Sequence, residues 1–186
     1  MRILMLGNSF TYFHDMPQIL AALLPAQVVA QTRGGAFLAD QINPEDEMGA
    51  QTLRLLKEEK WDYVVLQDHS RGPSHRKELF QETVDQLCPL IRAAGAKPIL
   101  YATWAYKEGT NKLASINMTY DDFSDALYAS YHEAAERNGA LIADVGRAFD
   151  ALRHLVSLYE ADDYHPSEVG SLVAAQAIAR VIEQNQ

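Results

Sequence analysis

Short apolar runs alternate along this chain with longer segments in which apolar residues recur at helical spacing. The short runs are rich in branched residues and predict strands at residues 2–6, 27–32, 62–67, 98–103 and 140–144. The longer segments predict helices at about 17–24, 47–59, 77–94, 121–138, 145–158 and 167–183. Gly95 and Gly139 follow two of these helices, where a C-terminal cap is expected.

The order of these elements predicts the fold class. Strands that alternate with helices favour right-handed βαβ crossovers and a parallel sheet covered on both faces. Five strands in this order predict a three-layer α/β/α sandwich of the flavodoxin-like type, formed by a single domain over residues 1–186. Ligands of such sheets bind at the carboxyl ends of the strands. The irregular stretch 105–120 follows the fourth strand, where we expect a wall or lid of a site.

Composition and charge narrow the class of protein. Hydrophobic residues make up 48% of the chain and charged residues 22%, as in ordinary globular proteins. The net charge of -9 argues against nucleic acid and anionic membranes as partners, because both attract basic surfaces. Cys88 is the only cysteine, so an internal disulfide is excluded. Residues 2–6 already form a strand pattern, and no leader or spanning segment is recognisable, so we expect a cytoplasmic protein.

Candidate chemistry lies at the two ends of the chain. Ser9 follows the first strand within Gly7-Asn8-Ser9, and Asp162 precedes His165 by three residues. A nucleophilic hydroxyl needs a base to take its proton, and the base needs a partner that holds its tautomer. Asp163 is an alternative partner, two residues from the histidine. No set of His, Cys, Asp and Glu has the spacing of a zinc site, so we expect neither metal nor cofactor.

These two motifs resemble the SGNH/GDSL hydrolase family of esterases and lipase-like enzymes, over residues 2 to about 183. The first family motif is Gly-Asp-Ser, matched here with asparagine at the middle position, and the last is Asp-x-x-His followed by proline. The resemblance implies a flavodoxin-like fold and an acyl-enzyme mechanism. It also implies that Ser9 is the nucleophile, His165 the general base and Asp162 the carboxylate that orients the base.

The same resemblance implies an oxyanion hole made of three donors. These are the N–H of Ser9, the N–H of a glycine after the second strand, and an asparagine after the third strand. Gly35 fits the second position better than its neighbour Gly34. The family's Gly-x-Asn-Asp motif is absent, and Gln67 begins the sequence Gln-Asp-His-Ser that replaces it. We expect the Gln67 amide to donate in place of asparagine.

Four further residues are candidates for substrate binding: Asn8, His69, Trp104 and Tyr106. Each also has a purely structural explanation, in a turn, on the surface or in packing, and Ser9 itself could be a helix cap.

The function we predict is hydrolysis of a small acyl ester, as an O-deacetylase of a carbohydrate or polar metabolite. The alternatives are a thioesterase or lysophospholipase, and a non-enzymatic mononucleotide-binding module that holds phosphate at the first turn. The last alternative leaves the Asp162–His165 motif unexplained.

Overall fold

A single parallel sheet forms the centre of the computed structural model, which describes all residues 1–186. Its strands are β1 (Arg2–Gly7), β2 (Gln27–Thr32), β3 (Tyr63–Leu66), β4 (Lys97–Tyr101) and β5 (Leu141–Ala143). The strand order is β2-β1-β3-β4-β5, and every neighbouring pair is parallel. This is the flavodoxin-like order, so the predicted fold class is confirmed.

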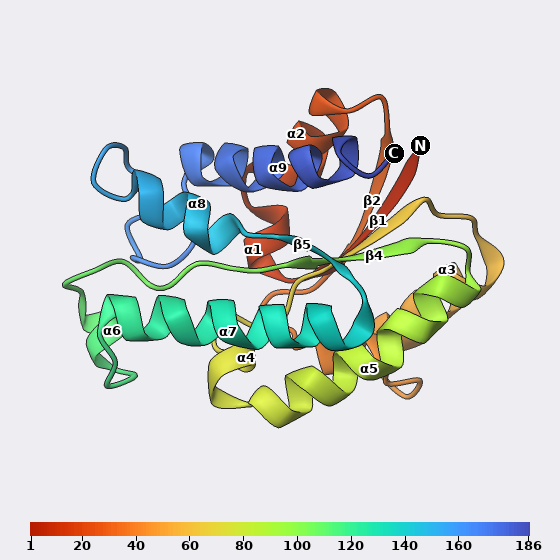
Figure 1. Cartoon of the computed structure of the whole chain (residues 1–186), viewed down its shortest axis with the longest axis horizontal. Helices are drawn as coiled ribbons and strands as arrows, with labels where there is room; N and C mark the ends of the chain where they lie inside the picture. Colours follow the sequence, from red (N-terminus) through yellow and green to blue (C-terminus); the bar gives the residue numbers. More distant parts are fainter.

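Helices cover both faces of the sheet (Figure 1). They are α1 (Ser9–Tyr12), α2 (Met16–Leu23), α3 (Glu47–Glu58), α4 (Gly72–His75), α5 (Lys77–Ala93), α6 (Asn111–Ala114), α7 (Tyr120–Asn138), α8 (Val145–Leu152) and α9 (Glu168–Glu183), with short 3-10 helices at Phe13–Asp15 and Leu38–Ile42. Helices α2, α8 and α9 lie on one side, and α3, α5 and α7 lie on the other (Figure 1). No helix combines the length and the apolar character that crossing a membrane requires.

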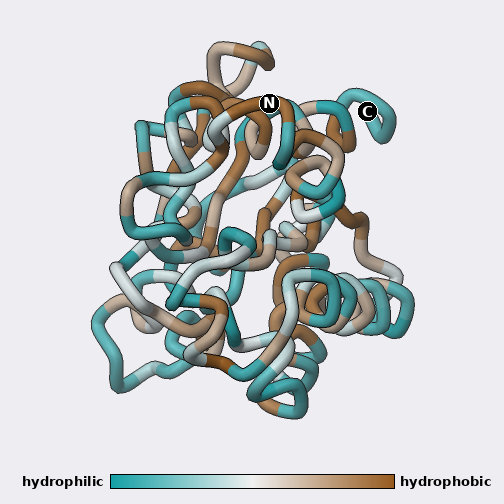
Figure 2. Tube along the Cα trace, turned by 90° about the vertical axis from the view of Figure 1, so that its left-hand side faces the viewer, coloured by the Kyte–Doolittle hydropathy of each residue, from teal (hydrophilic) through white to brown (hydrophobic).

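The two faces of the sheet contribute to two separate hydrophobic cores. Along β1, Ile3 and Met5 point into one core, while Leu4 and Leu6 point into the other, and all four are fully buried. Apolar side chains on both faces are expected for a central parallel strand, which explains the unbroken apolar run in the sequence. Figure 2 shows hydrophobic strands running through the middle of the molecule and hydrophilic stretches mostly at its periphery.

The clearest difference from the predicted elements is the length of α8. This helix ends at Leu152, whereas the apolar spacing predicted a helix over 145–158. Beyond it Leu155 is 74% exposed, while Leu158 is buried, so these apolar residues belong to a loop that packs through only some of its side chains. Within this loop, Tyr159 and Pro166 form an isolated antiparallel bridge that is separate from the sheet. The irregular stretch 105–120 also contains α6, whose Leu113 is buried in the core.

Candidate active site

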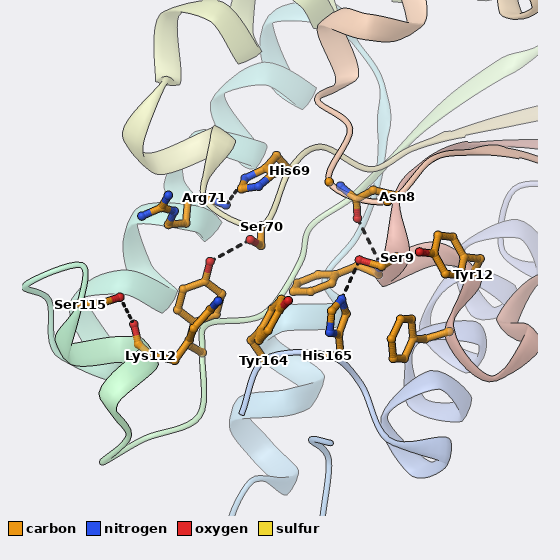
Figure 3. Close-up of a pocket in the computed structure, with 15 residues that line it drawn as sticks. Asn8, Ser9, Tyr12, His69, Ser70, Arg71, Lys112, Ser115, Tyr164 and His165 are labelled. Carbon is orange, nitrogen blue, oxygen red and sulfur yellow. Dashed lines mark hydrogen bonds between the residues drawn. The ribbon is translucent and has the colours of Figure 1, made fainter. Parts of the chain in front are cut away.

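The predicted site residues meet beyond the carboxyl ends of the strands. Ser9 follows β1, Gly35 follows β2 and His69 follows β3, while His165 arrives on the loop before α9. These four residues line one open cavity of about 580 Å³ (Figure 3). The parallel topology alone brings the first three loops to one edge, because parallel strands all end on the same side.

The turn that carries Ser9 is held by the side chain of Asn8. The Asn8 Oδ1 atom accepts the N–H of Phe10 at 3.1 Å, which caps the short helix α1. Its Nδ2 donates to the carbonyl of Ala36 at 2.9 Å and to that of Asp68 at 3.4 Å. An aspartate at this position could accept but could not donate to the two carbonyls. The asparagine thus joins the three loops that surround the site, and it is 2% exposed.

Ser9, His165 and Asp162 form a continuous chain of hydrogen bonds. The Nε2 atom of His165 lies 2.8 Å from the Ser9 Oγ, a contact drawn in Figure 3. The Nδ1 atom of the same ring lies 2.6 Å from the Asp162 Oδ2. The other carboxylate oxygen of Asp162 accepts the backbone N–H groups of Tyr164 and His165. Partial burial acts to raise the pKa of Asp162, but these hydrogen bonds outweigh it and lower the pKa below its ordinary value. The group is therefore an anion where an imidazolium would form.

The neighbouring carboxylate, Asp163, points elsewhere. Its backbone lies in the left-handed region at φ 68°, and its carboxylate lies 3.3 Å from the Nζ of Lys107. The geometry therefore favours Asp162 over Asp163 as the partner of His165.

Aromatic rings hold the imidazole of His165 in place. The ring of Phe13 stacks on it at a centroid distance of 4.1 Å and an interplanar angle of 3°. Tyr164 packs against it at 4.1 Å. The side chain of His165 is only 13% exposed, so its orientation is set by packing as well as by the carboxylate.

Two backbone donors border the same cavity. Gly35 lies in a turn with φ 71°, a conformation that favours glycine, and its N–H donates to no acceptor in the protein. The N–H of Ser9 is at the first position of α1, where a helix offers no acceptor. Gly34 also lines the cavity.

Gln67 is not placed as the sequence predicted. Its Oε1 accepts the N–H of Asn8 and the hydroxyl of Thr11, each at 2.9 Å, and its Nε2 donates to the Asp68 carbonyl. The residue is fully buried beneath the nucleophile turn and does not line the cavity. This contradicts the prediction that its amide donates to an oxyanion. Gly7 allows the arrangement, since a Cβ there would lie 2.6 Å from the Gln67 Oε1.

Trp104 is likewise a buried support and not a substrate contact. It is fully buried and stacks between Phe10 at 4.5 Å and Phe149 at 4.2 Å. Its indole N–H donates to the carbonyl of Tyr164 at 3.0 Å, directly before His165. The prediction that Trp104 contacts substrate is therefore contradicted, because the residue does not line the cavity. The packing explanation, which was the alternative, accounts for its position.

The candidates His69 and Tyr106 do line the cavity. The ring of His69 stacks on Phe37 at 4.5 Å, and its Nδ1 accepts the N–H of Arg71. The hydroxyl of Tyr106 lies 2.8 Å from the Ser70 Oγ. Both side chains are thus available to a ligand from fixed positions.

Several lining residues were not anticipated from the sequence: Ser70, Arg71, Lys112, Ser115 and Tyr164. Ser70 and Arg71 continue the polar cluster after β3, and that position was a usable signal. Lys112 and Ser115 lie in the irregular stretch 105–120, where no pattern distinguished them. Metal-ligating groups are not clustered, since no set of three or more His, Cys, Asp or Glu side chains could hold an ion.

A buried carboxylate, Asp68, directly precedes the cavity-lining residues His69, Ser70 and Arg71. Asp68 is 2% exposed and accepts the N–H of Leu38 at 2.6 Å. Burial raises the pKa of Asp68 to about 6, although the hydrogen bonds from Leu38 and His69 oppose the shift.

Solved structures with this fold match 97% or more of the chain. A protein from Slackia heliotrinireducens, assigned to the SGNH hydrolases, has a TM-score of 0.93 and 43% sequence identity over 98% of each chain. TesA has a TM-score of 0.74 at 16% identity, over 100% of each chain. A variant of Axe2, an acetyl xylan esterase from Geobacillus stearothermophilus, has a TM-score of 0.67 at 18% identity, over 97% of this chain and 94% of that chain. No family model and no curated protein matches the sequence.

The buried contacts of Gln67 predict a structural phenotype. Replacement Gln67→Met keeps the length of the side chain but leaves the Asn8 N–H and the Thr11 hydroxyl without their acceptor. We expect the free energy of unfolding, measured with urea, to fall by about 2–4 kcal/mol. Gln86→Met on the exposed face of α5 is the matched control, with little expected change. Unchanged stability together with a roughly 100-fold lower kcat would instead restore the oxyanion role.

The raised pKa of Asp68 predicts a pH-dependent stability. The folded protein holds a proton at Asp68 up to a pKa of about 6, whereas the ordinary value is 3.8. Between these values the folded state binds more protons, so the contribution of Asp68 to stability falls as the pH rises. The free energy of unfolding of the wild type should therefore fall, relative to that of the Asp68→Asn variant, by about 2–3 kcal/mol when the pH is raised from 4 to 7. Urea unfolding of both proteins at each pH measures this difference, and a difference independent of pH would refute the assignment.

Proposed function

The chain belongs to the SGNH hydrolase family, and on this premise we propose that it is a serine esterase that removes a short acyl group from a polar alcohol such as a carbohydrate. The observation that carries the proposal is the hydrogen-bonded chain from Asp162 through His165 to the Ser9 Oγ, at 2.6 Å and 2.8 Å. This chain opens onto the cavity, so a bound ester can reach the hydroxyl. These distances are the ones that nucleophilic catalysis by serine requires.

In the proposed mechanism, the Ser9 Oγ attacks the ester carbonyl carbon while the His165 Nε2 takes the hydroxyl proton. The imidazolium is stabilised by Asp162, and it then donates the proton to the departing alcohol oxygen. Water attacks the remaining acyl-enzyme with His165 again as the base, and the proton returns to Ser9. No other basic side chain lies within hydrogen-bond distance of the Ser9 Oγ.

The developing oxyanion would be held by the two backbone donors that border the cavity. The N–H groups of Ser9 and Gly35 have no competing acceptor in the protein, so they are available without a rearrangement. Each donor of this kind typically accounts for about 10²–10³ in kcat. Gln67 acts one step further away, because it accepts the Asn8 N–H and so fixes the peptide that leads into Ser9.

The lining of the cavity supports a short acyl group and a polar alcohol. All five hydrophobic residues among the fifteen that line it are aromatic: Phe10, Tyr12, Phe13, Tyr106 and Tyr164. A channel for a long acyl chain would need a run of aliphatic side chains, whereas aromatic faces suit the C–H face of a sugar ring. Axe2, which shares the fold, is an acetyl xylan esterase. The cavity, and not that likeness, is the basis for proposing carbohydrate O-deacetylation.

A panel of para-nitrophenyl esters from acetate to octanoate tests both parts of the proposal. The wild type should hydrolyse the acetate with a kcat/KM about 10-fold or more above that of the octanoate, because the aromatic walls leave no aliphatic channel. In Ser9→Ala, kcat for the acetate should fall by about 10⁴-fold or more, since the nucleophile is lost.

The matched control is Ser157→Ala, which removes an exposed hydroxyl from the loop before His165 without touching the cavity. Circular dichroism verifies that all three proteins are folded. Equal turnover by wild type and Ser9→Ala would overturn the triad, and a preference for octanoate would overturn the deacetylase while leaving an esterase.

A further inference from the structure

The end of the cavity away from Ser9 is cationic. Arg71 and Lys112 both line it, and none of the fifteen lining residues is an aspartate or a glutamate. Figure 3 shows Ser9 and His165 on one side of the cavity, and Arg71 and Lys112 on the other. The whole chain has 25 acidic and 16 basic residues, so an acid-free wall with two cations runs against its overall composition.

Neither cation is neutralised by a neighbouring carboxylate. No Asp or Glu oxygen lies within 4.0 Å of the side-chain nitrogens of Arg71 or Lys112, whereas Arg33, Arg137 and Arg147 each have a carboxylate partner. The Arg71 guanidinium makes no side-chain hydrogen bond either. Because an arginine fork offers several donors, this one is free to bind a ligand.

Lys112 is held on the wall by aromatic faces. Its Nζ lies 3.8 Å from the centroid of the Tyr164 ring and 5.6 Å from that of Tyr106. Cation–π contacts fix the ammonium group without neutralising its charge. Tyr164 is adjacent to His165 and packs on its ring, so one aromatic ring contacts both the ammonium group and the imidazole.

His69 lies near these charges. Burial, together with the positive charges of Arg71, Arg76 and Lys112, lowers the pKa of His69. Asp68 lies beneath the same loop but does not line the cavity, so it offsets this positive potential only from behind. The surface that a ligand meets is therefore positive.

We propose that the substrate of this site is an acyl ester whose alcohol part carries an anionic oxygen group, a carboxylate or a phosphate, which Arg71 and Lys112 bind while the ester lies against Ser9. The proposal rests on the proposed function and specifies its substrate class. An anionic group would receive charge-assisted hydrogen bonds from both side chains. A neutral sugar would leave both cations without a counter-charge, so it would not receive the charge-assisted hydrogen bonds that these two side chains can donate.

Matched pairs of acetyl esters test this. The acids are para-acetoxybenzoate, para-acetoxyphenylacetate and para-acetoxyphenylpropionate, which place the carboxylate at increasing distances from the ester, and the partner of each is its neutral methyl ester. The readout is the ratio of kcat/KM for acid over methyl ester, from release of the phenol. We expect a ratio of about 10 or more for at least one pair, mainly through KM, and a decline with added salt.

Variants separate a specific subsite from general charge effects. In Arg71→Gln and Lys112→Met, the ratio should fall about 3–10-fold each, because an exposed or half-buried charge contributes less than a buried one. Lys57→Met, which removes an exposed charge on α3 far from the cavity, is the control and should keep the wild-type ratio. Ratios near 1 for every pair, or equal changes in all three variants, would overturn the proposal.

Equilibrium binding keeps the two proposals distinguishable. Calorimetry with Ser9→Ala measures whether para-hydroxybenzoate binds more tightly than its methyl ester, and glucuronate, glucose phosphate and glucose show whether carboxylate or phosphate is preferred. Tight binding of anions by a protein that hydrolyses none of the esters would overturn the esterase but support the cationic subsite. Hydrolysis of neutral and anionic esters at equal rates, with no preference in binding, would overturn the subsite alone.

Discussion

The hydrogen bond between the His165 Nε2 and the Ser9 Oγ joins residues that are 156 positions apart. Its length of 2.8 Å depends on the surrounding contacts that hold each side chain in position. A hydroxyl and an imidazole that were free to move would meet only part of the time, so each must be held from behind. Ser9 is held by the buried amide side chains of Asn8 and Gln67. His165 is held by the Asp162 carboxylate and by the stacked ring of Phe13.

These supports come from different loops, which makes the site a product of the whole fold. The parallel sheet brings the ends of β1, β2 and β3 to one edge, and the asparagine and glutamine amides then connect the loops that follow. On the other side, the indole of Trp104 supports the carbonyl of Tyr164 from within the core. A buried amide or indole serves here because it donates or accepts in a fixed direction and carries no charge to desolvate.

The sequence was sufficient to predict the five strands, their flavodoxin-like arrangement and the loops that carry Ser9, Gly35 and His165. Those features follow from apolar periodicity and from motifs whose residues are near one another in the chain. The side-chain contacts of Gln67 and Trp104 were predicted wrongly, because position after a strand does not tell whether a side chain turns toward the cavity or under the neighbouring loop. The short α8 was missed for a related reason: Leu155 and Leu158 have helical spacing but only Leu158 is buried. Arg71 and Lys112 come to the same cavity only through the fold, so nothing in their local sequence identified them.

The central claim is that Ser9 is the nucleophile and that His165 activates it. The most direct measurement is labelling with a fluorophosphonate, followed by intact mass and peptide mapping of the adduct. The account predicts one adduct per chain on Ser9, and strongly slowed labelling when His165 is replaced by alanine, because the base is lost. Labelling at Ser70 on the opposite wall, or a rate that does not depend on His165, would contradict it.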